Sequence, residues 1–86
     1  MAEYEHNSEK FGYINLDDLQ GVQTALGKLD YDPGTIDGLD GPKTQNAVRR
    51  FQAHASIKVD GKVGPETRRA LVEELAKLSE EAPSAS

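Results

Sequence analysis

The chain has 86 residues, of which 36% are hydrophobic and 29% charged, which is enough for one small domain with a thin core. It contains no cysteine, and this excludes disulfides, thiolate metal ligands and cysteine nucleophiles. A net charge of −5 argues against a non-specific nucleic-acid binder, and no apolar run approaches the roughly 20 residues that cross a bilayer.

Charge is distributed unevenly along the sequence. Residues 1–40 carry nine acidic and two basic residues, whereas residues 41–69 carry seven basic and two acidic ones. A local excess of positive charge attracts anions even where the whole chain is acidic. The middle third is therefore the region where we expect an anionic ligand group to bind.

Both ends of the chain have the composition of disordered segments, because they offer little apolar surface to bury. We expect residues 1–14 to form a flexible arm, in which Phe11, Tyr13 and Ile14 cover the edge of the core. Residues 15–78 are expected to form the domain, and residues 79–86 a disordered tail. The first ten residues lack the basic and apolar regions of a secretory signal, so we expect the chain to be cytoplasmic as synthesised.

The first predicted helix spans residues 16–28. Asn15 is a suitable N-cap, and Asp17 and Asp18 suit the positive end of the helix dipole. Gly21 and Gly27 weaken this helix by up to ~1 kcal/mol each, so tertiary packing must hold it. Apolar residues recur at spacings of three and four along one face: Leu16, Leu19, Val22, Leu26 and Leu29.

A twelve-residue pattern then occurs twice, with an offset of 23 residues. Residues 37–48 (DGLDGPKTQNAV) align with residues 60–71 (DGKVGPETRRAL), and six of the twelve positions are identical. In each copy Asp-Gly forms a tight turn, for which we expect positive φ at Gly38 and Gly61. The second glycine is the N-cap, and the proline takes the first helical position, where its missing N–H costs nothing.

The repeat therefore predicts two further helices, at residues 42–55 and 65–78. Two repeats are too few for a solenoid, so a compact three-helix domain is expected. The side chains that should face the core are Thr44, Ala47, Val48 and Phe51 in the second helix, and Thr67, Ala70, Leu71, Leu75 and Leu78 in the third.

This pattern resembles the peptidoglycan-binding-like domain family, a three-helix module with a doubled D-G-x-x-G-P-x-T element. The resemblance covers roughly residues 16–76 and includes the pairs Val22-Gln23 and Phe51-Gln52. It implies an all-α fold, a compact three-helix bundle with two structurally repeated turn–helix elements. Asp30 and Ser56 depart from the family pattern, because they stand where it has glycine or asparagine at helix ends that need left-handed backbone.

The resemblance implies a non-catalytic binding module for bacterial cell-wall peptidoglycan, one that targets an associated hydrolase or assembly to the wall. The implied partners are the stem peptide or glycan and a fused or associated hydrolase, tail or secretion protein, with no nucleic acid, no membrane and no cofactor. The alternative is a structural or adaptor protein of a phage tail or contractile injection system, in which the fold serves protein–protein contact. Release from the cell or assembly into such a particle would bring the chain to the cell wall or periplasm.

A ligand surface is expected at the start of the second helix, where free backbone N–H groups suit a carboxylate and Lys43 lies beside them. The candidate ligand-binding residues are Asp37, Gly38, Gly41, Lys43, Gln45, Arg49, Asp60 and Gly61. Four arginines are expected either to be solvated or to contact an anionic ligand: Arg49, Arg50, Arg68 and Arg69.

We predict neither catalytic residues nor metal ligands. The acidic side chains take turn and cap roles, and no histidine or serine pairs with them in a recognisable catalytic pattern. His54 is expected to be exposed near the end of the second helix, where the negative helix end favours it. The acidic loop that starts at Asp30 does not fit an EF-hand, because Gly34 and Gly41 occupy its fifth and twelfth positions.

Overall fold

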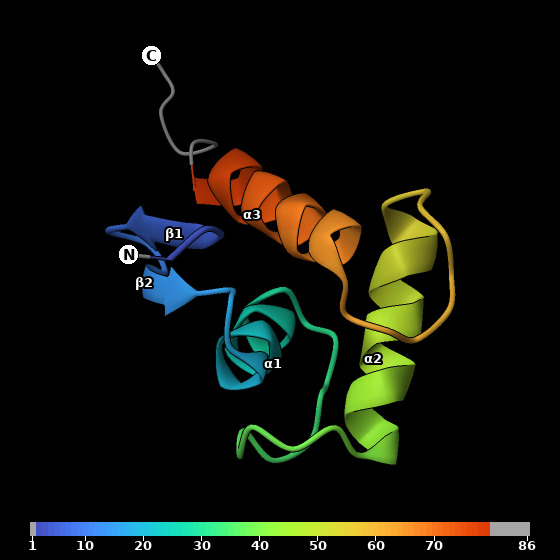
Figure 1. The fold of residues 1–86 in the computed structure, drawn as a ribbon. Helices are drawn as coiled ribbons and strands as arrows, with labels where there is room; N and C mark the ends of the chain where they lie inside the picture. The colour runs from blue at the N-terminus through green and yellow to red at the C-terminus, as the bar shows by residue number, and fades with distance from the viewer. Residues whose placement is uncertain (1, 80–86) are drawn as a thin grey trace.

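The computed structural model describes residues 2–79 and contains a two-stranded hairpin followed by three helices. In chain order the elements are β1 (Glu5–Ser8), β2 (Gly12–Asn15), α1 (Leu19–Lys28), α2 (Pro42–His54) and α3 (Pro65–Ser79). β2 packs against α1 and β1 against α3, whereas α2 lies at the other side of the molecule (Figure 1). The expected three-helix bundle is therefore confirmed, and a small hairpin is added to it.

The core draws apolar side chains from the three helices and from the end of the hairpin. Phe51 is fully buried, and its ring lies edge-on to that of Tyr31, with the ring centres 5.8 Å apart. Of the positions expected to face the core in α3, Ala70 and Leu78 are only partly buried. The buried apolar residues are Ile14, Leu16, Val22, Ala25, Leu26, Ala47, Val48, Phe51, Leu71 and Leu75.

The hairpin occupies most of the segment that the sequence assigned to a flexible arm. Its antiparallel register pairs His6 with Ile14 and Asn7 with Tyr13, so His6 and Ile14 face the core while Tyr13 faces outward. The carboxylate of Asp17 accepts hydrogen bonds from the backbone N–H groups of Glu3 and Tyr4, each at 2.8 Å. Backbone pairing and this anchor order the segment, although its composition is polar.

Of the expected tail, residues 80–86 lie outside the described residues, and Ser79 is the last residue of α3. Within residues 2–79, no helix combines the length and the apolar character that a membrane span requires.

The first helix begins three residues later than expected, at Leu19. The N–H of Leu16 donates to the carbonyl of Tyr4 at 2.8 Å, so this residue still belongs to the hairpin. The side chain of Asn15 accepts a hydrogen bond from the N–H of Asp17 at 2.9 Å and closes a turn ahead of the helix. The prediction of Asn15 as N-cap was therefore wrong, and Asp18 holds that position.

α1 and α2 end in the same way, each with a non-glycine residue in the left-handed region. Asp30 has φ 70° and Ser56 has φ 61°, as expected for these two positions. The residue after each of them returns a hydrogen bond into the last helical turn, Tyr31 to Leu26 at 2.8 Å and Ile57 to Gln52 at 3.1 Å. The N–H groups of Asp30 and Ser56 also donate to the carbonyls of Gly27 and Ala53, three residues back, and the two bonds at each helix end form a Schellman motif.

Candidate functional site

A buried glutamine organises the turn that precedes α2. Gln23 projects from α1, and its side-chain oxygen accepts hydrogen bonds from the N–H groups of Asp37 and Gly38, at 3.0 and 2.8 Å. Its amide nitrogen lies within hydrogen-bond distance of Asp37 Oδ1, the carbonyl of Leu39 and Thr44 Oγ1, at 3.3, 2.9 and 3.0 Å. One amide thus connects the preceding helix, the turn and the following helix.

Gln52 repeats this arrangement in the second copy. Its side-chain oxygen accepts from the N–H groups of Asp60 and Gly61, and its amide nitrogen faces Asp60 Oδ1, the carbonyl of Lys62 and Thr67 Oγ1. All five distances are 3.0 Å. The structural repeat is therefore longer than the repeat in sequence, because each turn includes a glutamine from the helix before it.

Four of the candidate ligand residues are used inside these two turns. The N–H of Leu39 and the amide of Gln23 hold the pKa of Asp37 below its ordinary value. The N–H of Lys62 and the amide of Gln52 do the same for Asp60. Gly38 and Gly61 have φ 78° and 73°, which confirms the expected left-handed turns. These residues shape the surface around the start of each helix.

A shallow pocket of about 340 Å³ lies in front of α2, and we call it the Lys43 pocket. Its residues come from the segment between α1 and α2 and from the first turn of α2. They are Pro33, Gly34, Thr35, Asp37, Leu39, Gly41, Pro42, Lys43 and Thr44.

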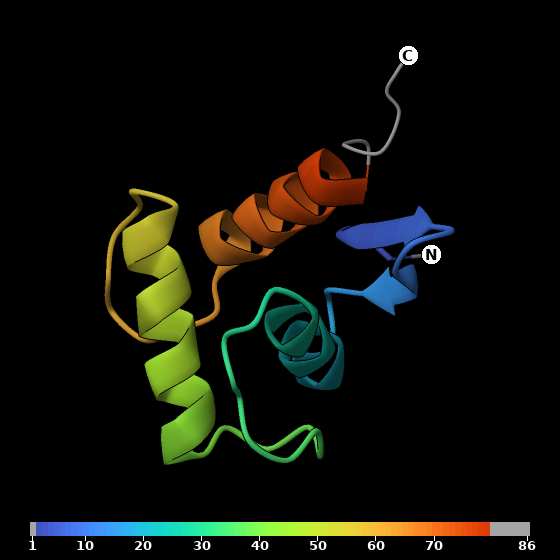
Figure 2. The same cartoon turned by 180° about the vertical axis from the view of Figure 1, so that it is seen from behind.

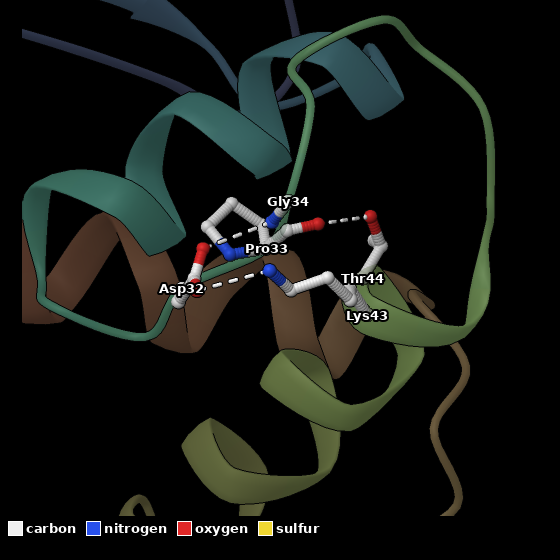
Figure 3. Close-up of polar contacts among 5 residues, drawn as sticks. All are labelled: Asp32, Pro33, Gly34, Lys43 and Thr44. Carbon is white, nitrogen blue, oxygen red and sulfur yellow. Dashed lines mark hydrogen bonds and ion pairs between the residues drawn. The ribbon is translucent and has the colours of Figure 1, made fainter.

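The side chain of Lys43, a residue that lines this pocket, points toward Asp32 (Figure 3). The two groups form an exposed ion pair, with Nζ 3.2 Å from Asp32 Oδ2. The N–H of Gly34 donates to the same carboxylate at 3.2 Å. This hydrogen bond is the larger cause, and Lys43 the next, of a pKa of Asp32 that lies below its ordinary value. Thr44 Oγ1 donates to the carbonyl of Pro33 at 2.8 Å and fixes the loop to the helix.

The Lys43 pocket combines apolar walls with a single positive charge among its described lining residues. Leu39 is 68% exposed at its edge. The N-cap of α2 is Gly41, which makes no side-chain cap hydrogen bond, so the first-turn N–H groups are not capped from within the turn. This chemistry suits a small apolar group that carries a carboxylate.

A corresponding pocket of about 300 Å³ lies in front of α3, with different charges. Glu66 occupies the place of Lys43, and Lys58 and Lys62 contribute positive charge. Asp60, Gly64, Pro65 and Thr67 line it as their counterparts line the first.

The structure does not bring the eight candidate ligand residues into one site. Asp37, Gly41 and Lys43 line the Lys43 pocket, and Gly38 lies in the adjoining turn. Gln45 donates to the carbonyl of Asp40 at 3.3 Å and stays at the edge of that turn. The guanidinium of Arg49 lies about 3 Å from the place where a Cβ on Gly61 would stand, so Arg49 belongs with the second turn.

Arg68 has a structural position. Its guanidinium donates to the carbonyls of Leu16 and Val63 at 2.8 and 2.9 Å, and it ties the start of α3 to the end of the hairpin. Arg69 pairs with Glu73 one turn along α3, and both side chains are exposed.

Within residues 2–79, His54 and the acidic side chains do not gather into a metal site. His54 Nε2 lies 3.7 Å from Glu74 Oε2 and is more than half exposed. Among the residues that the structure describes, no group of three or more histidine, aspartate or glutamate side chains converges as a metal site would require.

Sequence comparison identifies the family. Residues 15–71 match the family described as "Putative peptidoglycan binding domain", which is more than half of the chain. The chain belongs to this family. The match covers α1, both glutamine-centred turns, α2 and the first half of α3, and it leaves out β1 and nearly all of β2.

Two curated proteins contain a segment similar to this peptidoglycan-binding domain. "Probable N-acetylmuramoyl-L-alanine amidase" of Bacillus licheniformis is 45% identical over 53 residues, which is 55% of this chain and 15% of that protein. "N-acetylmuramoyl-L-alanine amidase CwlM" of Mycobacterium tuberculosis (strain ATCC 25618 / H37Rv) is 38% identical over 55 residues, which is 64% of this chain and 14% of that protein. The chain therefore spans about one seventh of the length of either relative. No solved structure gave a significant match.

Proposed function

We propose that the chain is a non-catalytic module that binds bacterial peptidoglycan and directs an associated cell-wall hydrolase to the wall. The observation that carries this proposal is the Lys43 pocket, which lies inside the segment matched by the peptidoglycan-binding family. It joins apolar walls, one cation and an uncapped helix N-terminus at one place.

The stem peptide of peptidoglycan is the ligand class that fits this combination. Stem peptides present small apolar side chains and carboxylates close together. Leu39 and Pro42 offer the apolar surface, while Lys43 and the first-turn N–H groups of α2 offer partners for a carboxylate. We place the stem-peptide carboxylate beside Lys43.

Asp32 competes with that carboxylate for Lys43. Both side chains of the pair are about 70% exposed, so the pair is worth only ~0.2–1 kcal/mol and is screened by salt. Exchange of Asp32 for a ligand carboxylate therefore costs little. So shallow a site gives a dissociation constant of ~10 μM to 1 mM, and tethering to a hydrolase raises the effective affinity.

The relatives support the hydrolase-targeting role. Both are named as amidases, and the segment that resembles this chain is a small fraction of each. A small domain that recurs within longer proteins named as amidases is suited to hold such an enzyme at its substrate.

Co-sedimentation with purified wall sacculi at low salt tests the proposal. We expect the wild type to sediment with the sacculi and to be released as salt rises toward physiological strength. Lys43→Gln should reduce retention several-fold, and Asp32→Asn, which keeps an acceptor for Gly34 but frees Lys43, should increase it. Lys28→Gln removes the same charge from the exposed end of α1 and is the matched control.

The wild type should release no soluble fragments from the sacculi, whereas fragment release would contradict the non-catalytic assignment. If the wild type stays in the supernatant at high protein concentration and low salt, wall binding is wrong. The role of an adaptor that docks to another protein then replaces it.

A further inference from the structure

A third pocket lies between the hairpin and α1, and we call it the hairpin pocket. It has a volume of about 250 Å³, below the roughly 300 Å³ at which pockets for drug-sized ligands begin, so it suits one unit of a polymer. Its lining residues are Tyr13, Ile14, Asn15, Asp18, Gln20, Gly21 and Thr24.

Tyr13 is the aromatic residue among the described residues that line this pocket. The side chain is 57% exposed, and its hydroxyl donates to Glu5 Oε1 on the neighbouring strand at 2.9 Å. The strand register also fixes its backbone, opposite Asn7. A ring that is already held in place loses little conformational entropy when a ligand stacks on it.

The helical side of the hairpin pocket is built from polar groups. Gln20 and Thr24 lie one turn apart on α1, and the Thr24 hydroxyl donates to the carbonyl of Gln20 at 2.9 Å. Gly21, between them on α1, faces the end of β2, and the backbone of Asn15 rests directly against it. Hairpin and helix are thus fixed to each other at the base of the pocket.

The polar groups of this pocket select against anions. Its described lining residues include amide, hydroxyl and carboxylate side chains but no lysine or arginine, and Asp18 adds negative charge. Glu5, which accepts the hydrogen bond from the Tyr13 hydroxyl, adds a further carboxylate nearby. An aromatic face beside neutral hydrogen-bonding groups suits a neutral polyhydroxylated ring, whose apolar face stacks while its hydroxyls bond.

The hairpin pocket and the Lys43 pocket are neighbours. A Cβ on Gly38 would stand 3.9 Å from the Cβ of Gln20, so Gln20, which lines the hairpin pocket, lies near the turn that borders the Lys43 pocket. In both views of the molecule α1 lies between β2 and the loop that leads to α2 (Figures 1 and 2). This adjacency suits a polymer that carries neutral sugars and anionic peptides close together.

We infer that the hairpin pocket binds the neutral N-acetylated glycan of the wall, while the Lys43 pocket binds the attached peptide. This inference rests on the proposed function and adds to it a separate sugar site. Tyr13 lies outside the segment that matches the family, so the hairpin supplies a recognition element beyond the matched domain.

The test is a titration of the ¹⁵N-labelled chain with a tetramer of N-acetylglucosamine, which carries no peptide and no charge. We expect amide shifts at Tyr13, Gln20 and Thr24, and none at Gly41 or Lys43. Tyr13→Ala should weaken binding about tenfold or more, because the stacking face is lost. Tyr13→Phe keeps the ring and should restore most of the affinity, and Val59→Ala, an exposed apolar truncation outside the lining of both pockets, should change nothing.

The inference is overturned if the tetramer shifts no hairpin-pocket amide at millimolar concentration, or if Tyr13→Ala binds it as well as the wild type does. The amide shifts of His6 and Ile14 in each variant report whether the hairpin stays docked. Retention on sacculi separates the two proposals. If it persists and still depends on Lys43, only the sugar site is wrong, whereas its loss in the wild type removes the proposed function itself.

Discussion

The carbonyl oxygen of Asn15 lies so close to Gly21 that a Cβ at position 21 would overlap it. The end of the hairpin therefore rests on the backbone of α1, and no residue other than glycine lets it come so near. From sequence, Gly21 only weakens the helix. In the structure it is the contact through which the hairpin joins the bundle.

The two glycines of α1 should consequently respond to alanine with opposite signs. Gly21→Ala should lower the free energy of unfolding by ~1–3 kcal/mol, because the hairpin must move away from the helix. Gly27→Ala should raise it by ~0.5–1 kcal/mol, since the nearest atom to its Cβ is Pro33 Cδ at 4.0 Å and the helix gains propensity. Urea denaturation measures both values, and equal effects of the two substitutions would refute the contact.

The repeat in sequence was sufficient to predict α2, α3 and their turns, because Asp-Gly, Gly-Pro and the buried threonine each have a local physical role. The left-handed backbone at Asp30 and Ser56 was expected from the family resemblance, because these residues stand where the family pattern has glycine or asparagine at helix ends. These features depend on residues close together in the chain, and such features can be inferred from sequence.

The hairpin and the division of the candidate site could not be predicted in this way. The order of residues 2–15 depends on Asp17 binding the N–H groups of Glu3 and Tyr4, and an exposed aspartate in sequence gives no sign of this. The candidate residues were grouped around the start of the second helix and the two turns that were expected to border it, yet Lys43 turns to Asp32 and Arg49 to Gly61. Where such a side chain lies depends on the direction in which it leaves its helix and on which residues distant in sequence it contacts, and neither can be inferred from the repeat.

Of the polar positions in the domain, the glutamine at the centre of each turn should be the one where substitution lowers stability most. Gln52→Glu puts a carboxylate within 3.0 Å of Asp60 Oδ1 and the carbonyl of Lys62, where the amide had donated hydrogen bonds. A buried charge without a partner costs ~3–5 kcal/mol, which is enough to unfold most of so small a domain at neutral pH. Thermal unfolding followed by circular dichroism measures the loss.

Gln23→Glu should behave in the same way, because Gln23 makes the equivalent bonds in the first turn. The matched control is Gln20→Glu, an exposed position on the same helix, which should change stability by no more than ~0.5 kcal/mol. If Gln52→Glu remains within ~1 kcal/mol of the wild type, the amide is not the centre of the turn.

Replacing the left-handed residue that follows α2 should raise the stability of the domain. Ser56 has φ 61°, a conformation that costs an ordinary L-residue ~1–2 kcal/mol and glycine almost nothing. After allowing for the greater freedom of glycine in the unfolded chain, Ser56→Gly should stabilise the domain by ~0.5–1 kcal/mol. Ala55→Gly, one residue earlier at φ −80°, should destabilise it instead, and a gain at both positions would contradict the conformational explanation.

Acid should unfold the domain partly through Asp17. The N–H groups of Glu3 and then Tyr4 lower the pKa of this carboxylate from its ordinary value of 3.8, because they donate to its charged form. The unfolded chain then binds the proton more tightly, so the stabilisation is present above pH 3.8 and is lost as pH falls through the lower folded value.

Asp17→Asn should be less stable than the wild type at neutral pH and should show a shallower loss of stability between about pH 4.5 and 2. Urea denaturation across that range measures the slope, with Glu9→Gln in the hairpin turn as the control that should keep the wild-type slope. If Asp17→Asn and the wild type lose stability in parallel, the carboxylate does not anchor the first residues of the hairpin.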